Sequence, residues 1–189
     1  VYRATLDEKG VGLVANRADP TGEFLASKDI WFRPVQMANA PDGALFVVDI
    51  YRELIEGAAF LPPEFVKYID PVSGNDRGRI YRLAPKGFNA SQVNTNLSEL
   101  SALELAALLE HPNGWHRDTA SRLLYQKQDR SVVTTLLKLA HGSSSPVGRM
   151  TALHSLHGLN SLEAEHLLPA LADRHPLVIV QALRLAESF

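Results

Sequence analysis

The hydrophobic pattern of this chain of 189 residues changes its period near the middle, and that change limits the folds open to it. Up to about residue 84, short apolar runs alternate with Gly and Pro turns, a pattern typical of β-strands. From Ser98 onward, leucines recur three and four residues apart, as they do on one face of an α-helix. We therefore expect an α+β chain: a strand-rich part at 1–84, a linker at 85–97 and a helical part at 98–189.

The strand-rich part contains several runs that can pair across tight turns. Val1–Leu6 is expected to pair with Val11–Asn16 across a turn at Asp7–Gly10. The other elements expected here are strands at Val35–Asn39, Leu45–Asp49 and Arg79–Leu83, turns at Pro41–Gly43 and Gly74–Gly78, and a short helix near Glu64–Ile69. Short strands closed by such turns indicate a terminal blade of a β-propeller. One blade leaves two sheet edges unpaired, so we expect further blades upstream.

The helical part carries signals for helix starts and stops. Ser101 with Glu104 and Asn160 with Glu163 have the spacing of capping boxes. The other signals are an N-cap at Asp129, an N-cap at Ser145 followed by Pro146, and helix ends near Gly142 and Gly158.

A sequence repeat runs through the same part. A small residue recurs at Ala120, Ala152 and Ala182, about 30 residues apart, and a proline precedes each at Pro112, Pro146 and Pro176. Two helices per unit at this period predict an α-solenoid of about three HEAT-like hairpins.

Composition excludes several kinds of function. The chain has no cysteine, which excludes disulfides, thiolate metal sites and covalent haem attachment within these residues. A formal net charge of −2 gives no electrostatic reason to expect nucleic acid as a partner. Neither end has the pattern of a natural terminus, and no signal peptide is present, so we expect a piece of a longer chain.

Four segments in order resemble a known family: Phe24–Val35, Pro41–Glu53, Asp76–Arg82 and His111–Ala120. They look like the PVC-type membrane-bound dehydrogenases, a haem-binding CxxCH family. The resemblance implies a propeller similar to sorbosone or glucose dehydrogenases, followed by HEAT repeats and a cytochrome c domain. It also implies PQQ, calcium and c-type haem in the parent protein, and a periplasmic or membrane-associated location. The CxxCH motif is absent, so we expect this piece to bind no cofactor and to be inactive alone, with the remaining blades and a downstream cytochrome c domain as its partners.

The segment around the second strand of the Pro41–Gly43 hairpin gives the candidate site. Arg33 precedes one strand, and five polar residues follow the next: Asp49, Tyr51, Arg52, Glu53 and Glu56. We expect Arg33, Asp49, Tyr51, Arg52 and Glu56 to bind a polar substrate such as a sugar. The competing interpretation is an ion-pair cluster that only locks the structure. No catalytic residue is identified.

Other polar and aromatic residues favour structural roles. Asp76, Arg77 and Arg79 are expected at a turn, and Trp31 and Trp115 in packing, with sugar stacking as the alternative for Trp31. His154 and His157 lie three residues apart on one expected helix, and His166 lies at the start of the next hairpin. This spacing alone does not give the coordination geometry of a metal site, so no metal site is expected.

Three functions remain open at this point. The first is part of a dehydrogenase acting on a sugar or alcohol, with the helical part as a spacer. The second is a non-enzymatic scaffold that binds a protein partner on the solenoid, which an apolar or single-signed concave face would favour. The third is a carbohydrate-binding propeller without redox chemistry.

Overall fold

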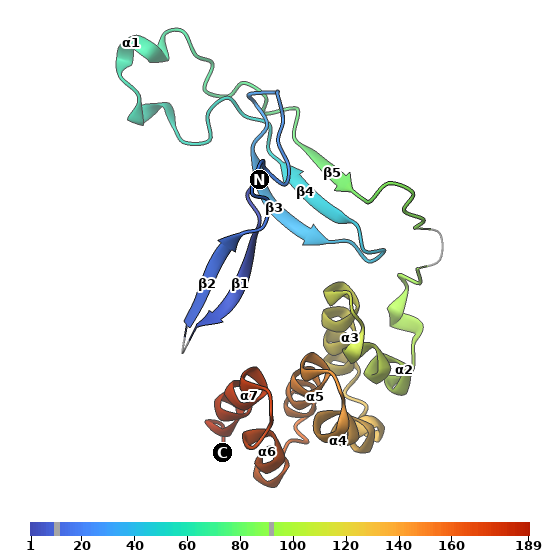
Figure 1. Cartoon of the computed structure of the whole chain (residues 1–189). Helices are drawn as coiled ribbons and strands as arrows, with labels where there is room; N and C mark the ends of the chain where they lie inside the picture. The colour runs from blue at the N-terminus through green and yellow to red at the C-terminus, as the bar shows by residue number, and fades with distance from the viewer. Residues whose placement is uncertain (10–11, 91–92) are drawn as a thin grey trace. The chain divides into compact units, whose positions relative to one another are not determined.

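A computed structural model describes residues 1–9, 12–90 and 93–189 (Figure 1). The chain divides into two compact units. The first comprises Val1–Ala38 and Leu45–Ala84, and the second comprises Asn39–Ala44 and Pro85–Phe189. Among the described residues, no helix has the length and apolar character needed to cross a membrane.

The first unit begins with a two-stranded antiparallel sheet. Strands β1 (Ala4–Lys9) and β2 (Gly12–Arg17) pair in a register that runs from Ala4 opposite Arg17 to Lys9 opposite Gly12. The predicted hairpin is present, but the predicted turn at Asp7–Gly10 is wrong for its first residues, which lie in β1. Charged residues are tolerated there because the described residues of β2 are all exposed and no face of the ribbon needs to be apolar. Gly10 and Val11 lie outside the described residues.

The second sheet has three antiparallel strands in the order β3–β4–β5: Pro34–Asn39, Leu45–Asp49 and Arg79–Leu83. These match the predicted strands closely. β4 pairs with β5 so that Val47 faces Tyr81 and Asp49 faces Arg79. Val47 is fully buried, whereas most of β3 and β5 is exposed.

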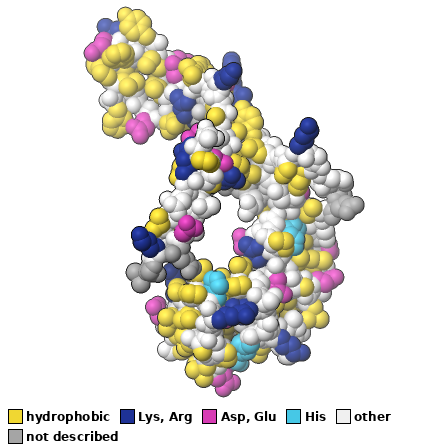
Figure 2. Space-filling model, viewed as in Figure 1, with side chains coloured by type: hydrophobic (Ala, Val, Ile, Leu, Met, Phe, Trp, Pro, Cys, Tyr) yellow, Lys and Arg dark blue, Asp and Glu magenta, His cyan; other side chains and the backbone are white. Residues whose placement is uncertain are grey.

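Between β4 and β5 the chain makes a long excursion. It contains a 3₁₀ turn, Ala58–Phe60, and a short helix α1, Pro63–Val66, where a helix was predicted. Figure 2 shows hydrophobic side chains at the surface of this segment; those exposed over more than half of their surface are Ile55, Phe60, Phe65, Tyr68 and Val72.

The expectation of a propeller blade is wrong. The five strands form two separate small sheets, and the described residues contain no closed sheet and no propeller. A blade requires four strands in one sheet, but in the part of the chain that the structure describes the β1–β2 ribbon pairs only within itself and the β3–β5 sheet has three strands. The turn spacing in the sequence indicated the strands correctly but not which sheets they join.

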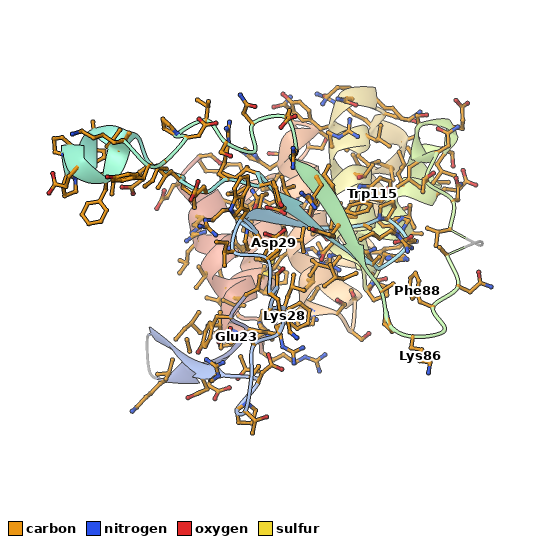
Figure 3. The ribbon with its side chains drawn as sticks, turned by 90° about the horizontal axis from the view of Figure 1, so that it is seen from above. Glu23, Lys28, Asp29, Lys86, Phe88 and Trp115 are labelled. Carbon is orange, nitrogen blue, oxygen red and sulfur yellow. The ribbon has the colours of Figure 1, made fainter. Side chains whose placement is uncertain are left out.

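The second unit is helical. Its α-helices are α2 (Ala102–Ala107), α3 (Gly114–Lys127), α4 (Val133–Gly142), α5 (Pro146–Gly158), α6 (Ala164–Leu171) and α7 (Pro176–Ala186), with 3₁₀ turns at Leu97–Glu99, Leu108–Glu110 and Arg130–Val132. One hydrophobic cluster joins them, and the predicted small residues Ala120, Ala152 and Ala182 are fully buried in it. Trp115 packs against the cluster from α3, as predicted, and is labelled in Figure 3.

The predicted helix caps can be compared one by one. Ser101 and Glu104 form the capping box, while Asp129 and Ser145 accept hydrogen bonds from Ser131 N and Gly148 N. The box at Asn160 is wrong. Asn160 has a left-handed backbone (φ 49°), and the N-cap is Glu163, whose backbone N donates to His166 Nδ1 at 3.0 Å.

The prediction of an α-solenoid is also wrong, since the helical unit does not form a clear solenoid. Stacked repeats need similar units, but the three helix pairs differ. α2 has 6 residues and α3 has 14, α4 starts from a 3₁₀ turn, and α6 contains Pro169. The repeated residues all lie in the second helix of each pair, so the repeat did not predict the length or start of the first helix.

Candidate functional site

A buried carboxylate lies at the end of β4 in the first unit. Asp49 is 1% exposed, and its Oδ1 accepts hydrogen bonds from the backbone N atoms of Arg33 and Tyr51, each at 2.8 Å. Its Oδ2 is buried and has no hydrogen-bond partner among the described residues. Asp49 therefore fixes two chain segments through one oxygen and leaves the other to ionic contact alone.

Arg79 supplies that ionic contact. Its Nε lies 3.8 Å from Asp49 Oδ2, and its guanidinium carbon lies 3.8 Å from the centre of the Tyr51 ring. The same side chain donates to Arg77 O at 3.2 Å. Arg79 was expected beside a turn, at the start of a strand, and this contact with Asp49 was not predicted. Antiparallel pairing of the two predicted five-residue strands would have placed Asp49 directly opposite Arg79.

The backbone around Tyr51 is unusual and tightly packed. Tyr51 has a left-handed backbone (φ 50°), and Gly74, at φ 85°, lies against it. A Cβ atom at position 74 would lie 2.1 Å from the Tyr51 carbonyl oxygen, so only glycine fits there. The loop before β5 is thereby held against the end of β4.

A cavity of about 680 Å³ opens beside this cluster within the first unit. Asp49, Arg52, Glu56 and Arg79 bring charge to it, and Leu54, Ile55, Pro71 and Ile80 form apolar parts of its lining. Arg52 is anchored by a hydrogen bond from Nη1 to Val72 O at 2.8 Å. The volume lies within the range of small-molecule sites.

A second cavity, of about 330 Å³, lies on the same loop. It shares Val72 and Asn75 with the first and is lined also by Trp31, Asp70, Ser73, Gly74, Asp76 and Arg77. Trp31 packs against Tyr51, with 5.6 Å between the ring centres, and its backbone N donates to Asp29 Oδ1 at 3.0 Å (Asp29 is labelled in Figure 3). An aromatic face thus meets carboxylate, amide, hydroxyl and guanidinium groups in one small space.

The predicted site residues divide into two groups. Asp49, Arg52 and Glu56 line the larger cavity, as a binding role requires. Arg33 and Tyr51 are not among its lining residues. The Arg33 guanidinium donates to the carbonyl oxygens of Ile30, Phe32 and Glu53, and Tyr51 packs between Trp31 and Arg79. These contacts give Arg33 and Tyr51 structural positions beside the site.

The helical unit contains a groove of about 590 Å³ formed by α3, α5 and α7. Asp118 and Arg122 bring opposite charges to it, Ser121, Thr151, Ser155 and Gln181 bring polar groups, and Tyr125 and Met150 contribute apolar surface. Because its charges have both signs, the groove does not have the single-signed face that would favour a protein-binding scaffold. His154, one of its lining residues, contacts Gln181 Oε1 at 2.9 Å.

The resemblance implies its cofactors for the parent protein and not for these residues alone. A c-type haem is attached through cysteine thiols, and the chain has no cysteine. Within residues 1–9, 12–90 and 93–189, no group of three or more His, Cys, Asp or Glu side chains that could hold a metal ion is found.

Comparison with known proteins gives one match. A family model described as "Domain of unknown function (DUF7133)" matches residues 1–87, less than half of the chain. No curated protein and no solved structure matches. The matched residues include the two cavities described above, so the chain is similar, over the part that holds the candidate site, to a domain of unknown function.

Proposed function

We propose that the first unit binds a sugar or sugar alcohol at the Trp31 cavity, the space of about 330 Å³ defined above. The observation that supports this most is the combination of an aromatic ring with hydrogen-bonding groups that are not already used. The side chains of Ser73 and Asn75 make no hydrogen bond with the residues that the structure describes, and Asp70 uses only Oδ1, which accepts from Val72 N at 3.0 Å.

The chemistry of these groups suits a polyhydroxylated ligand. Sugars present hydroxyl groups that both donate and accept, and C–H faces that pack on aromatic rings. Asp70 Oδ2 can accept from one hydroxyl, Asn75 can donate and accept, and Trp31 provides the ring. The adjacent cavity, with Arg52, Glu56 and Arg79, would accommodate a further polar portion of a longer ligand.

In the same proposal, this ligand is the substrate of a sugar or alcohol dehydrogenase that works in the periplasm or at a membrane. The support is the resemblance of four sequence segments, two of which, Phe24–Val35 and Asp76–Arg82, contribute Trp31, Asp76 and Arg77 to the cavity. The redox group would come from outside these 189 residues. Dye-linked oxidation of a sugar by a longer protein containing this chain would support the enzymatic part.

Binding itself is tested by calorimetric titration of the full chain with D-glucose and D-sorbitol. We expect saturable binding of at least one of them, weakened about tenfold by Trp31→Ala. Trp115→Phe, in the other unit, is the matched control and should leave the affinity unchanged. Absence of saturable binding, or equal affinity of Trp31→Ala and the unmodified chain, would reject the proposal.

A further inference from the structure

An arginine beside the Trp31 cavity has hydrogen-bonding groups that the chain does not use. Arg52 is half-buried, and its backbone N donates to Trp31 O at 3.1 Å. At the other end of the residue, Nη1 of the guanidinium donates to Val72 O at 2.8 Å. Trp31 lines the Trp31 cavity, and Val72 lines both this cavity and the larger one of about 680 Å³. Arg52 is therefore held where the two cavities adjoin.

The other edge of the Arg52 guanidinium is accessible and unbonded. Its Nε and Nη2 make no hydrogen bond with the residues that the structure describes. Both atoms have accessible surface, since the buried side-chain atoms that lack a partner in that part of the chain belong to Asp49, His116 and His175. The Nε–H and one Nη2–H point in the same direction and match the two oxygens of a carboxylate. Arg52 therefore keeps a complete fork for an acid group.

The charges that line the larger cavity leave Arg52 without an ion-pair partner. Arg79 is balanced by Asp49, whose Oδ2 lies 3.8 Å from Arg79 Nε. No aspartate or glutamate among the described residues forms an ion pair with Arg52. Glu56 also lines the cavity, but it is exposed, so water and salt weaken its electrostatic effect. Arg52 is thus a half-buried cation that an acidic ligand can neutralise.

The neighbouring carboxylates limit how much negative charge a ligand can bring. In the Trp31 cavity, Asp76 lies 3.6 Å from Arg77, while Asp70 has no ion-pair partner among the described residues. The cation of Arg52 can balance one carboxylate. A phosphate monoester carries a charge of about −1.5 to −2 near pH 7 and would leave excess negative charge beside Asp70 and Glu56. The lining therefore favours a carboxylate over a phosphate.

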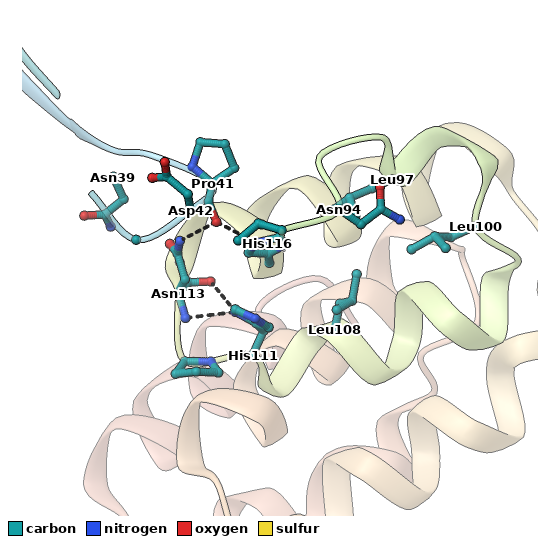
Figure 4. Close-up of a pocket in the computed structure, with 14 residues that line it drawn as sticks. Asn39, Pro41, Asp42, Asn94, Leu97, Leu100, Leu108, His111, Asn113 and His116 are labelled. Atoms are coloured by element: carbon teal, nitrogen blue, oxygen red, sulfur yellow. Dashed lines mark hydrogen bonds between the residues drawn. The ribbon is translucent and has the colours of Figure 1, made fainter. Parts of the chain in front are cut away.

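The cavity of about 710 Å³ in the helical unit, shown in Figure 4, offers no such group. Two of its polar side chains are bonded within the protein: Asn113 Nδ2 donates to Pro41 O at 3.1 Å, and His111 Nδ1 accepts from Asn113 N at 3.0 Å. Of the residues that the structure describes, no lysine or arginine lines it. An acid group therefore finds a counter-charge at Arg52 and none in this cavity.

We infer that the sugar bound by the first unit is an acidic sugar of the uronic acid class, and that Arg52 binds its carboxylate through Nε–H and Nη2–H. The sugar ring lies against Trp31, and the carboxylate points toward the larger cavity. This inference rests on the proposed function, because it names the class of sugar that the same site takes.

The test compares four ligands by calorimetric titration of the full chain near pH 7, where a carboxyl group is ionised. We expect D-glucuronate to bind about tenfold more tightly than D-glucose. D-glucuronamide, in which a neutral amide replaces the carboxylate, should bind no more tightly than D-glucose. D-glucose 6-phosphate should bind more weakly than D-glucuronate.

Variants then locate the carboxylate. Arg52→Gln removes the charge and the fork, and should reduce the ratio of the association constants for glucuronate and glucose from about ten to about one. Arg52→Lys keeps the charge without the fork and should give an intermediate ratio. Arg184→Gln, which makes the same change of charge at an exposed position of α7, should leave the ratio unchanged.

Equal affinities for glucuronate and glucose, equal affinities for glucuronate and glucuronamide, tighter binding of the phosphate, or an unchanged ratio in Arg52→Gln would each overturn the inference. If glucose still bound, these results would leave the proposed sugar site standing. Absence of saturable binding of all four ligands would reject the proposed function and this inference with it. The comparison with glucuronamide uses the unmodified chain, so it holds even if Arg52→Gln fails to fold.

Discussion

The two units hold their structures by different means. The helical unit buries a continuous cluster of leucines, valines and alanines from Leu97 to Leu185. Among the described residues of the first unit, Val47 is the one buried hydrophobic side chain, and the buried polar one is Asp49. Apolar burial therefore stabilises the helices, whereas hydrogen bonds to one carboxylate and the close approach of Gly74 organise the loops of the first unit.

The largest effect is expected where the helical unit itself depends on a buried charge. Arg149, with its side chain 4% exposed, donates from Nε and Nη2 to the two carboxylate oxygens of Asp173 at 2.7 and 2.8 Å. Arg149→Ala leaves Asp173 uncompensated and should lower the free energy of unfolding by about 3–5 kcal/mol in urea denaturation followed by helical circular dichroism.

The matched control for this pair replaces both partners. The double variant Arg149→Met with Asp173→Leu leaves no unpaired charge and should regain most of the lost stability. If Arg149→Ala lowered the free energy of unfolding by less than about 1 kcal/mol, the pair would contribute no more to stability than an exposed ion pair does.

The next effect should fall on the first unit alone. Gly74→Ala places a methyl group where the Tyr51 carbonyl oxygen lies and forces a non-glycine residue to φ 85°. We expect the loop before β5 to lose about 2 kcal/mol of local stability, measured as faster hydrogen exchange there. Gly57→Ala, where a Cβ meets nothing within 4 Å, is the control. Equal exchange in the two variants would show that the close packing at Gly74 is not needed.

A smaller effect is expected from pH. The hydrogen bonds from Arg149 lower the pKa of Asp173 below its ordinary value. A lowered pKa stabilises the folded state above the ordinary Asp pKa of about 3.9, and the gain is lost as the pH falls through the folded pKa. The free energy of unfolding should therefore fall below about pH 4, and the double variant should show a flatter acid dependence. Identical slopes would contradict this.

The smallest effect belongs to a helix cap. Ser101 Oγ accepts from Glu104 N at 3.3 Å, and Glu104 Oε2 accepts from Ser101 N at 2.8 Å. Ser101→Ala should lower the free energy of unfolding by about 1 kcal/mol. Ser144→Ala, at an exposed position between α4 and α5 whose hydroxyl makes no hydrogen bond with the described residues, is the control. No difference between the two would show that the capping box adds nothing to the stability of the helical unit.

Local signals in the sequence predicted local structure well. The strands at Leu45–Asp49 and Arg79–Leu83 and the caps at Ser101 and Ser145 depend on a few neighbouring residues, and the structure has them where expected. The cap at Asn160 was placed wrongly because the box is made by Glu163 and a histidine, a pair that the Ser/Thr–Glu pattern does not include.

What failed depends on residues distant in the sequence. The pairing of strands into two sheets, and the differences between the helix pairs, are set by tertiary contacts that turn spacing and a repeat do not specify. The site shows the same limit. The position of Asp49, Arg52 and Glu56 after a strand predicted a binding site; these residues line the larger cavity, and their binding role stays a prediction. Arg79 and Gly74 come to the same place only when the loop returns to β4.

Hydrogen exchange of the full chain, followed by mass spectrometry, tests most directly whether the two units are stabilised differently. Amides of α3, α5 and α7 should exchange only through the largest openings of the helical unit, because these helices hold its buried cluster. Amides of β3, β4 and β5 should exchange through smaller openings, at least a hundredfold faster than the slowest helical amides, a ratio equivalent to roughly 2.7 kcal/mol. Protection of these strands equal to that of α5 would contradict the account.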